Sequence, residues 1–140
     1  MATEHWEHLE HGADIGIRGY GATPAEAFRQ AALALTALIT EPGKIRLRES
    51  VQIEREAPDL EFLLLDWINA LVYEMATRRL LFGRYAVEIA DGRLTATAEG
   101  EPVDIERHRP AVEVKGATLT ALQVVETAPG QWLAQCIVDV

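Results

Sequence analysis

Hydrophobic and polar positions alternate with a period of two at the start of the chain. Ile15 and Ile17 are separated by small or polar residues, and residues 4–20 as a whole are expected to form one or two strands. Strand interiors usually avoid aspartate and closely spaced glycines. Because this segment contains both Asp14 and several glycines, we expect a close approach of the backbone and a fixed carboxylate here.

Two segments change to the period of a helix. In the first, Thr23 and Glu26 form a capping box around Pro24, and apolar residues follow at helical spacing to about residue 40. In the second, Asp59 is the expected N-cap, and the helix extends to about Arg79. This second helix is apolar almost all round, which is typical of a helix buried in the middle of a domain. Its narrow polar stripe is expected to contact a polar seam or a loop, and consists of Asp66, Asn69, Tyr73 and Thr77.

The remaining apolar runs predict strands. Residues 45–56 alternate apolar and charged side chains, and residues 85–90 and 93–99 flank Asp91-Gly92, a two-residue hairpin signal. After a charged loop, further strands are predicted over 111–115, 119–126 and 131–140.

Helices and strands do not alternate regularly along the chain, so a doubly wound parallel fold is disfavoured. We predict an α+β fold instead. It consists of a single domain, 1–140, with two main helices (about 24–40 and 59–79) packed on an antiparallel or mixed β-sheet.

Composition and charge narrow the functional class. The chain has 140 residues and a formal net charge of −9. This balance argues against broad contact with nucleic-acid phosphates, and it suits a basic partner or a hard cation. No apolar run is long enough to span a membrane and the N-terminus lacks a signal-peptide pattern, so we expect a cytoplasmic protein. The single cysteine, Cys136, is expected to be a buried apolar residue.

The last residues offer a group of carboxylates. A strand over 131–140 would hold the Asp139 side chain close to the α-carboxylate of Val140. If this strand pairs beside the strand that starts at Asp14, three carboxylate groups converge, and such a group suits Mg²⁺, Mn²⁺ or Ca²⁺. The alternative is an edge aspartate beside an ordinary solvated terminus. The sequence alone does not establish the pairing.

The three N-terminal histidines do not predict a zinc site. On a strand, His5 and His11 share a face but lie about 20 Å apart, and His8 points the other way. Local turn or capping roles are the expectation. The sequence also lacks a phosphate-binding loop and a nucleophile elbow.

A charged segment near residue 105 contains a second group of ionisable residues. Glu101, Asp104 and His108 would be able to form an acid–base group, but the richness of the segment in charge favours solvated surface. Lys115 follows an alternating run and is expected to face away from the core, where it would neutralise a carboxylate or contact a partner.

Several segments together resemble one family, the archeases. The N-terminal part of its signature matches His11-x-Ala13-Asp14-Ile15-Gly16-Ile17-x-Gly19-Tyr20-Gly21, followed by Pro24-x-Glu26-Ala27-Phe28. The second helix resembles the family motif in Leu64-Leu65-Asp66-Trp67-Ile68-Asn69-x-Leu71. The family's order continues in Gly100-Glu101, Asp104, Arg107-His108, Val114-Lys115 and Val138-Asp139-Val140. The joint order of these motifs covers essentially the whole chain.

The resemblance implies a small α+β protein that activates an RNA ligase of the RtcB type in tRNA splicing or RNA repair. The ligase attaches GMP to its own histidine, using GTP and Mn²⁺. The family member is not the catalyst; it accelerates this guanylylation, permits multiple turnover and broadens nucleotide use. A divalent cation (Ca²⁺, Mg²⁺ or Mn²⁺) is implied at Asp14, Asp139 and Val140. The other matched polar residues are the expected partner contacts: Glu101, Asp104, His108 and Lys115.

Two positions depart from the family pattern. Gly12 stands where threonine is usual, and Leu119-Thr120 stands where an aromatic–histidine pair is common. Neither departure removes an implied metal ligand. Two other functional classes stay open. One is a stand-alone metal-dependent phosphoester hydrolase that uses Asp14 and Asp139, with His108 as base. The other is a chaperone-like module for RNA-modifying enzymes.

Overall fold

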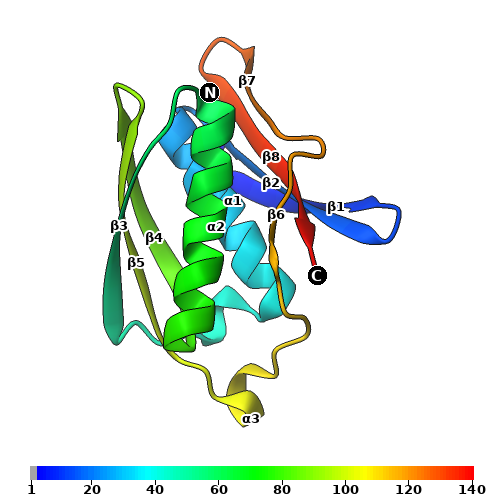
Figure 1. Cartoon of the computed structure of the whole chain (residues 1–140), viewed down its shortest axis with the longest axis vertical. Coiled ribbons are helices and arrows are strands. Elements are labelled where there is room, and N and C mark those ends of the chain that lie inside the picture. The colour runs from blue at the N-terminus through cyan, green and yellow to red at the C-terminus, as the bar shows by residue number, and fades with distance from the viewer. Residues whose placement is uncertain (1–2) are drawn as a thin grey trace.

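Two antiparallel sheets enclose the two long helices of the protein. The computed structural model describes residues 3–140, and Figure 1 shows α1 and α2 between a three-stranded sheet on the left and a five-stranded sheet behind and to the right. The helices are α1 (Pro24–Ile39), α2 (Leu60–Arg78) and the one-turn α3 (Ile105–His108), with a 3₁₀ turn η1 (Pro42–Lys44). The strands are β1 (His5–His11), β2 (Asp14–Gly21), β3 (Glu49–Glu56), β4 (Leu80–Ala90), β5 (Arg93–Pro102), β6 (Gly116–Ala117), β7 (Gln123–Ala128) and β8 (Gln131–Asp139).

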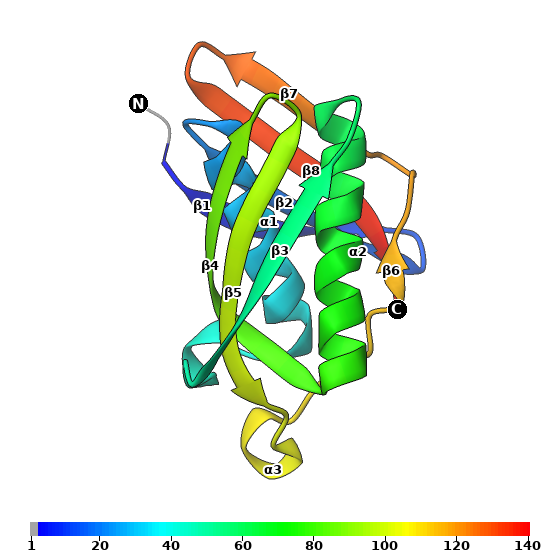
Figure 2. The same ribbon diagram turned by 60° about the vertical axis from the view of Figure 1, so that its left-hand side comes forward.

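Strand β8 is the centre of the five-stranded sheet. The order is β1-β2-β8-β6, and β7 pairs with β8 as well. Antiparallel pairing sets Ile15 opposite Val138 at one end of the β2–β8 ladder and Gly21 opposite Trp132 at the other. The second sheet has the order β3-β5-β4, as Figure 2 shows from its side. Strand β8 therefore connects the N-terminal hairpin to the last third of the chain.

The helix starts follow the signals in the sequence. The Glu26 N–H donates to Thr23 Oγ1 (3.2 Å), and Glu26 Oε1 accepts from the Ala22 N–H (3.2 Å). At the second helix, the Phe62 N–H donates to Asp59 Oδ1 (2.8 Å). These bonds satisfy donors that a helix leaves unpaired in its first turn, so both predicted N-caps are confirmed.

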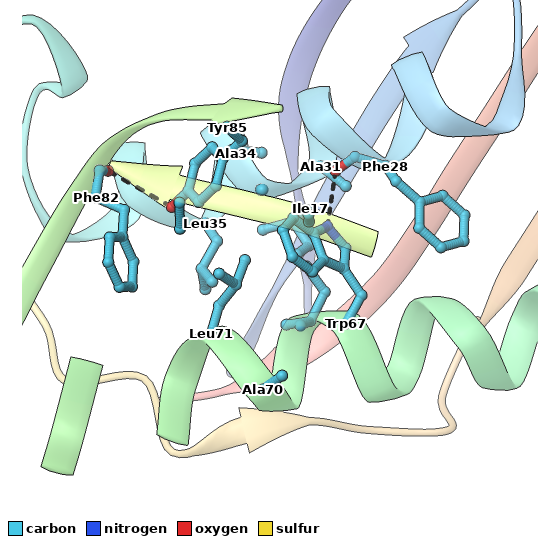
Figure 3. Packing of buried hydrophobic residues seen from close by; sticks show 14 of the residues in the cluster. Ile17, Phe28, Ala31, Ala34, Leu35, Trp67, Ala70, Leu71, Phe82 and Tyr85 are labelled. Atoms are coloured by element: carbon cyan, nitrogen blue, oxygen red, sulfur yellow. Dashed lines mark hydrogen bonds between the residues drawn. The ribbon is translucent and has the colours of Figure 1, made fainter. Parts of the chain in front are cut away.

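One continuous core joins the helices to both sheets. Trp67 of α2 is fully buried, and its indole N–H donates to the Phe28 carbonyl oxygen in α1 (3.1 Å; Figure 3). The Tyr85 hydroxyl reaches the Phe82 carbonyl oxygen (3.5 Å) in the same view. Cys136 is buried as predicted, and burial raises the pKa of its thiol to about 12. The polar groups of Trp67 and Tyr85 thus have hydrogen-bond partners inside an apolar core.

The α+β class is confirmed, but the single predicted sheet is two sheets. Both helices lie between them, so each sheet buries one face. The second helix is not buried all round, because Phe62 (44% exposed) and Tyr73 (62% exposed) face solvent. Its polar stripe does hold a loop: the Ala117 N–H donates to Asn69 Oδ1 (2.8 Å) and thereby fixes β6 against α2.

Several strand and loop boundaries differ from the prediction, and β4 begins at Leu80 rather than at residue 85. Residues 45–48 precede β3 and belong to no strand, and residues 111–115 are irregular because no neighbouring strand pairs with them. The run 119–126 is interrupted by a turn at Ala121, whose φ of 54° ends a strand, so β7 begins only at Gln123. The charged segment 100–110 contains the end of β5 and the helix α3. Alternation in the sequence detects a face that is half buried, but not whether a partner strand is present.

Strand β2 packs directly against the main chain of α1. A Cβ atom at Gly19 would collide with the Ala27 carbonyl oxygen and the Ala31 nitrogen, which are backbone atoms that cannot rotate away. The close approach of the backbone that the glycine pattern predicts is therefore found at Gly19.

Gly19→Ala is expected to lower the free energy of unfolding by about 3 kcal/mol, because the helix must move off the sheet to admit a methyl group. Urea denaturation measures the change. Gly43→Ala is the control, since a Cβ at Gly43 meets no atom within 4 Å, and its effect should stay within about 0.5 kcal/mol. Equal effects of the two substitutions would contradict this packing.

Candidate functional site

Asp14 and Asp139 lie at the adjoining ends of two paired strands. Strand β2 begins at Asp14 and β8 ends at Asp139, and the last paired residues of their ladder are Ile15 and Val138. Asp14 and Asp139 each lie one position beyond this last pair, at the same end of the two strands. Both side chains are exposed. The β2–β8 pairing, which the sequence alone did not establish, thus places both aspartates at the same end of the sheet.

The two aspartates also share one face of the sheet. Arg18 of β2 and Gln135 of β8 are paired, and Arg18 Nε donates to Gln135 Oε1 (2.9 Å) on the outer face. Side chains alternate along a strand, so Asp14 and Asp139, each four positions away from this pair, point to the same side. The inner face carries buried residues such as Ile17, on the side that α1 covers.

His11, Lys115 and Val140 surround the two strand ends. His11 is opposite Asp14 in the β1–β2 ladder, and the Lys115 N–H donates to the Asp139 carbonyl oxygen (2.7 Å). Val140 follows Asp139 and is half-buried. Gly12, in the turn before Asp14, has a φ of 62°, a conformation that favours glycine over the threonine usual in the resembled family. The departure at this position therefore suits the turn.

This arrangement has a definite electrostatic consequence. Like charges directly opposite each other on neighbouring strands destabilise a sheet, and a bound cation removes that repulsion. Among residues 3–140, no three His, Cys, Asp or Glu side chains are grouped closely enough to hold a metal ion. A cation at Asp14 and Asp139 would therefore need main-chain oxygen, such as that of Val140, and water as further ligands, which hard cations accept. We refer to Asp14, Asp139 and Val140 as the strand-end site.

Glu101 and His108 form a buried polar cluster with Arg107, away from the strand-end site. The Arg107 guanidinium donates to both Glu101 oxygens (2.8 Å each), and the Arg46 N–H donates to Glu101 Oε2 (2.7 Å). The His108 Nδ1 accepts from the Asp104 N–H (2.8 Å), so its Nε2–H is the donor to Glu101 Oε2 (3.0 Å). The bidentate Arg107 contact, above all, holds the pKa of Glu101 far below its usual range.

These contacts correct two expectations. Glu101 (4% exposed) and His108 (1% exposed) are not solvated surface, because the ion pair and the ring hydrogen bonds draw them inside. Buried side chains do not contact a partner directly, and both His108 nitrogens have protein partners, so this ring is not free to act as the base of a hydrolase. Asp104 is exposed and caps α3 through the Arg107 N–H (3.1 Å), and Lys115 is exposed.

One further polar group lies on β1 and β2, and the sequence pattern did not reveal it. Arg18 Nη1 donates to Glu7 Oε1 (2.8 Å), and the Tyr20 hydroxyl donates to the same oxygen (2.7 Å). His5 and His8 do not take the turn or capping roles expected of them: His5 stacks on Tyr20 of the neighbouring strand, and His8 Nε2–H donates to the Ala34 carbonyl oxygen in α1 (2.7 Å). Alternation along a strand shows that Arg18 and Tyr20 share a face. It does not show that Glu7 lies on the same face, because that depends on the β1–β2 register.

Replacing Glu101 by glutamine is expected to lower the free energy of unfolding by about 3 kcal/mol near neutral pH, because it leaves Arg107 without its buried counter-charge. In the unfolded chain this carboxyl titrates near a pKa of about 4.3, well above its folded value. The stabilisation is therefore complete above that pH and declines as the pH falls below it. Urea unfolding at pH 7 and pH 3 measures both effects.

The control for this prediction is Glu99→Gln on the same strand. Glu99 pairs with Arg84 at 3.3 Å near the surface, so its substitution should cost less than about 1 kcal/mol. The difference in the free energy of unfolding between the wild type and Glu101→Gln should be smaller at pH 3 than at pH 7. An equal difference at both pH values would contradict the buried ion pair.

The fold and the site define a class: a small α+β protein with two helices between antiparallel sheets and an acidic pair of strand ends. The model of the Archease protein family (MTH1598/TM1083) matches residues 6–140. The chain therefore belongs to the archease family.

Relatives support this assignment over nearly their full length. The chain is 42% identical to the protein archease of Pyrococcus furiosus, covering 96% of this chain and 98% of the relative. It is 40% identical to that of Thermococcus gammatolerans, with 96% and 97% covered. Among solved structures, the solution structure of Methanobacterium thermoautotrophicum protein 1598 superposes with a TM-score of 0.84 at 31% identity, over 96% of this chain and 98% of that one. Within residues 3–140, no helix is long and apolar enough to cross a membrane.

Proposed function

We propose that the protein is a non-catalytic activator of an RtcB-type RNA ligase in tRNA splicing or RNA repair. It promotes guanylylation of the ligase and its multiple turnover. The observation that carries this proposal is the family match over residues 6–140, and the position of Asp14 and Asp139 at the adjoining ends of β2 and β8 supports it. Two motif residues from opposite ends of the chain thus lie at the ends of two paired strands.

The strand-end site is proposed to bind one divalent cation, Ca²⁺, Mg²⁺ or Mn²⁺. Asp14 and Asp139 supply carboxylate oxygens from two rigid strands, and Val140 supplies a main-chain oxygen. Carboxylate, carbonyl and water oxygens are the ligands that these hard cations prefer. The exposure of both aspartates leaves coordination positions open to water or to a group of the partner.

The proposed mechanism is electrostatic. Guanylylation brings together a triphosphate, metal ions and a histidine, so charge must be arranged before the chemical step. Groups that are already oriented toward developing charge lower a barrier without reorganising, and each 1.4 kcal/mol or so corresponds to about tenfold in rate. An acidic protein with a net charge of −9 suits docking at the basic mouth of a nucleotide-binding enzyme. Asp14 and Asp139 would hold the cation at that contact.

Divalent cations are expected to raise the melting temperature of the wild-type protein in a saturable manner. At a concentration a hundredfold above Kd, one bound ion stabilises the fold by about 2.7 kcal/mol, equivalent to a rise on the order of 8 °C for a domain of this size. Asp14→Asn and Asp139→Asn should abolish the rise without destabilising the cation-free protein, because each also removes a like-charge contact. Differential scanning fluorimetry with MnCl₂, MgCl₂ and CaCl₂ provides the measurement.

Asp91→Asn is the matched control for the cation titration. Asp91 is an exposed aspartate in the β4–β5 turn with a φ of 52°, where asparagine is equally suitable. It should keep the full rise in melting temperature. A rise that survives in both strand-end variants would place the cation elsewhere.

The ligase assay tests the function itself. Wild-type protein should accelerate guanylylation of an RtcB-type ligase with GTP and Mn²⁺, and Asp14→Ala or Asp139→Ala should reduce that acceleration at least about tenfold. Asp91→Asn again serves as control. No stimulation by the wild type would sink the proposed function. Full stimulation by both alanine variants would leave the function standing and refute the role of the strand-end site.

A further inference from the structure

An apolar groove lies at the end of the molecule that holds α3. It has a volume of about 220 Å³ and is bounded by the C-terminal half of α2, the start of β4 and the segment 103–114. Figures 1 and 2 both show the chain between α3 and β6 beside the lower part of α2. Its lining is apolar apart from the Glu113 carboxylate, and includes Val72, Met75, Ala76, Leu80 and Val112. We call it the α2 groove.

One wall of the α2 groove has unused backbone hydrogen-bonding groups. Residues 111–115 have the alternation of a strand, with Val112 half-buried and Val114 buried, yet no strand pairs with them. The Ala111 N–H donates to the Ile39 carbonyl oxygen (2.8 Å), and the Lys115 N–H donates to Asp139. Between these two anchors, the backbone groups of residues 112–114 make no hydrogen bond within the described part of the chain. A strand pattern without a strand partner is a template for pairing with another chain.

Two arginines adjoin lining residues of the α2 groove along the chain. Arg79 and Arg109 directly precede the lining residues Leu80 and Pro110, and both arginines are exposed. Among residues 3–140, neither guanidinium forms an ion pair, whereas the neighbouring Arg78 pairs with Glu74 and Arg107 pairs with Glu101. The Arg109 Nε donates to the Glu106 carbonyl oxygen (3.4 Å), so the positive charges of both arginines are without a carboxylate partner among residues 3–140.

The backbone at these two arginines is unusual. Arg79 (φ 54°) and Arg109 (φ 47°) are the C-caps of α2 and α3, and both adopt the left-handed conformation that favours glycine. The chain keeps arginine at two positions where glycine would relieve strain. Such strain is a reason to look for a role of the side chain beyond stability.

From these three features we infer that the α2 groove binds an extended segment of a partner protein that is both acidic and apolar. The segment adds a strand beside residues 112–114, its apolar side chains enter the groove, and its carboxylates pair with Arg79 and Arg109. Main-chain pairing of this kind gives affinity, and pockets for alternate side chains give specificity. The groove is smaller than the roughly 300–1,000 Å³ of sites that enclose small ligands, which favours one or two side chains of a peptide.

This interaction surface differs from the strand-end site and does not depend on the proposed function. Its chemistry is the reverse of that site, since it presents cations and apolar groups where the strand ends present carboxylates. The phosphates of an RNA strand would pair with the arginines. However, the residues lining the groove include no aromatic ring on which a base would stack. A phosphate backbone also has no apolar side chain to fill the groove. The observations therefore favour a peptide.

The test uses the full chain and a fluorescein-labelled peptide of alternating glutamate and valine, about eight residues long. We expect saturable binding that salt weakens. Amide chemical-shift changes in ¹H–¹⁵N spectra should concentrate at residues 109–115 and in the second half of α2. The same peptide with alternate backbone nitrogens methylated should bind at least about tenfold more weakly, because it cannot add a strand.

The double variant Arg79→Gly/Arg109→Gly removes both guanidinium groups while relaxing the left-handed backbone, so it should fold at least as stably as the wild type. Its peptide affinity should fall at least about tenfold. Ala121→Gly, which relaxes another left-handed residue, and Arg55→Ala, which removes an exposed cation on β3, should bind normally.

Three results would each overturn the inference. The first is no peptide binding at millimolar concentration, and the second is undiminished binding by the double glycine variant. The third is chemical-shift changes at the groove caused by an oligouridylate of equal charge in place of the peptide.

Discussion

The pairing of β2 with β8 is the constraint on which the rest of the molecule depends. The ladder from Ile15–Val138 to Gly21–Trp132 joins two strands from opposite ends of the sequence. On its inner side, Gly19 lets the backbone of α1 lie directly on β2, and this contact fixes how α1 sits between the two sheets. At one end of the ladder, just beyond Ile15 and Val138, the two strands end in Asp14 and Asp139. The packing of α1 and the strand-end site therefore both depend on the β2–β8 pairing.

Carboxylates in this protein are held in two contrasting ways. Glu101 is buried and neutralised by Arg107, with additional bonds from His108 and the Arg46 N–H, so its charge serves the fold. Asp14 and Asp139 are exposed at adjoining strand ends, and neither forms an ion pair among residues 3–140. The first arrangement uses charge to join β5, α3 and the chain before β3. The second leaves charge available for a ligand, which is why only the second is proposed to be functional.

Local signals in the sequence were sufficient for the helices, the hairpin turn and the helix caps. Thr23 and Asp59 act within three residues, and Asp91-Gly92 determines its own turn, so no distant contact is needed to recognise them. The number of sheets and the fate of residues 111–115 depend on which strands meet, and alternation alone does not encode that. The pairing of β2 with β8, on which the proposed strand-end site depends, was stated from the sequence only as a condition and is found in the structure. The burial of Glu101 and His108 was missed because composition describes a segment as charged without showing that its charges face each other.

The position of β8 in the chain has a consequence for how the protein is made. On the ribosome, β1, β2 and α1 emerge first, but the edge of β2 that pairs with β8 stays open until residues 131–139 have been synthesised. At roughly 5–20 residues per second, that interval lasts on the order of ten seconds. Closing so long a loop is also slow relative to local hairpins. The glycines and the charged Arg18 make the open edge of β2 a poor template for aggregation. The residues that are unusual for a strand interior therefore protect the nascent chain.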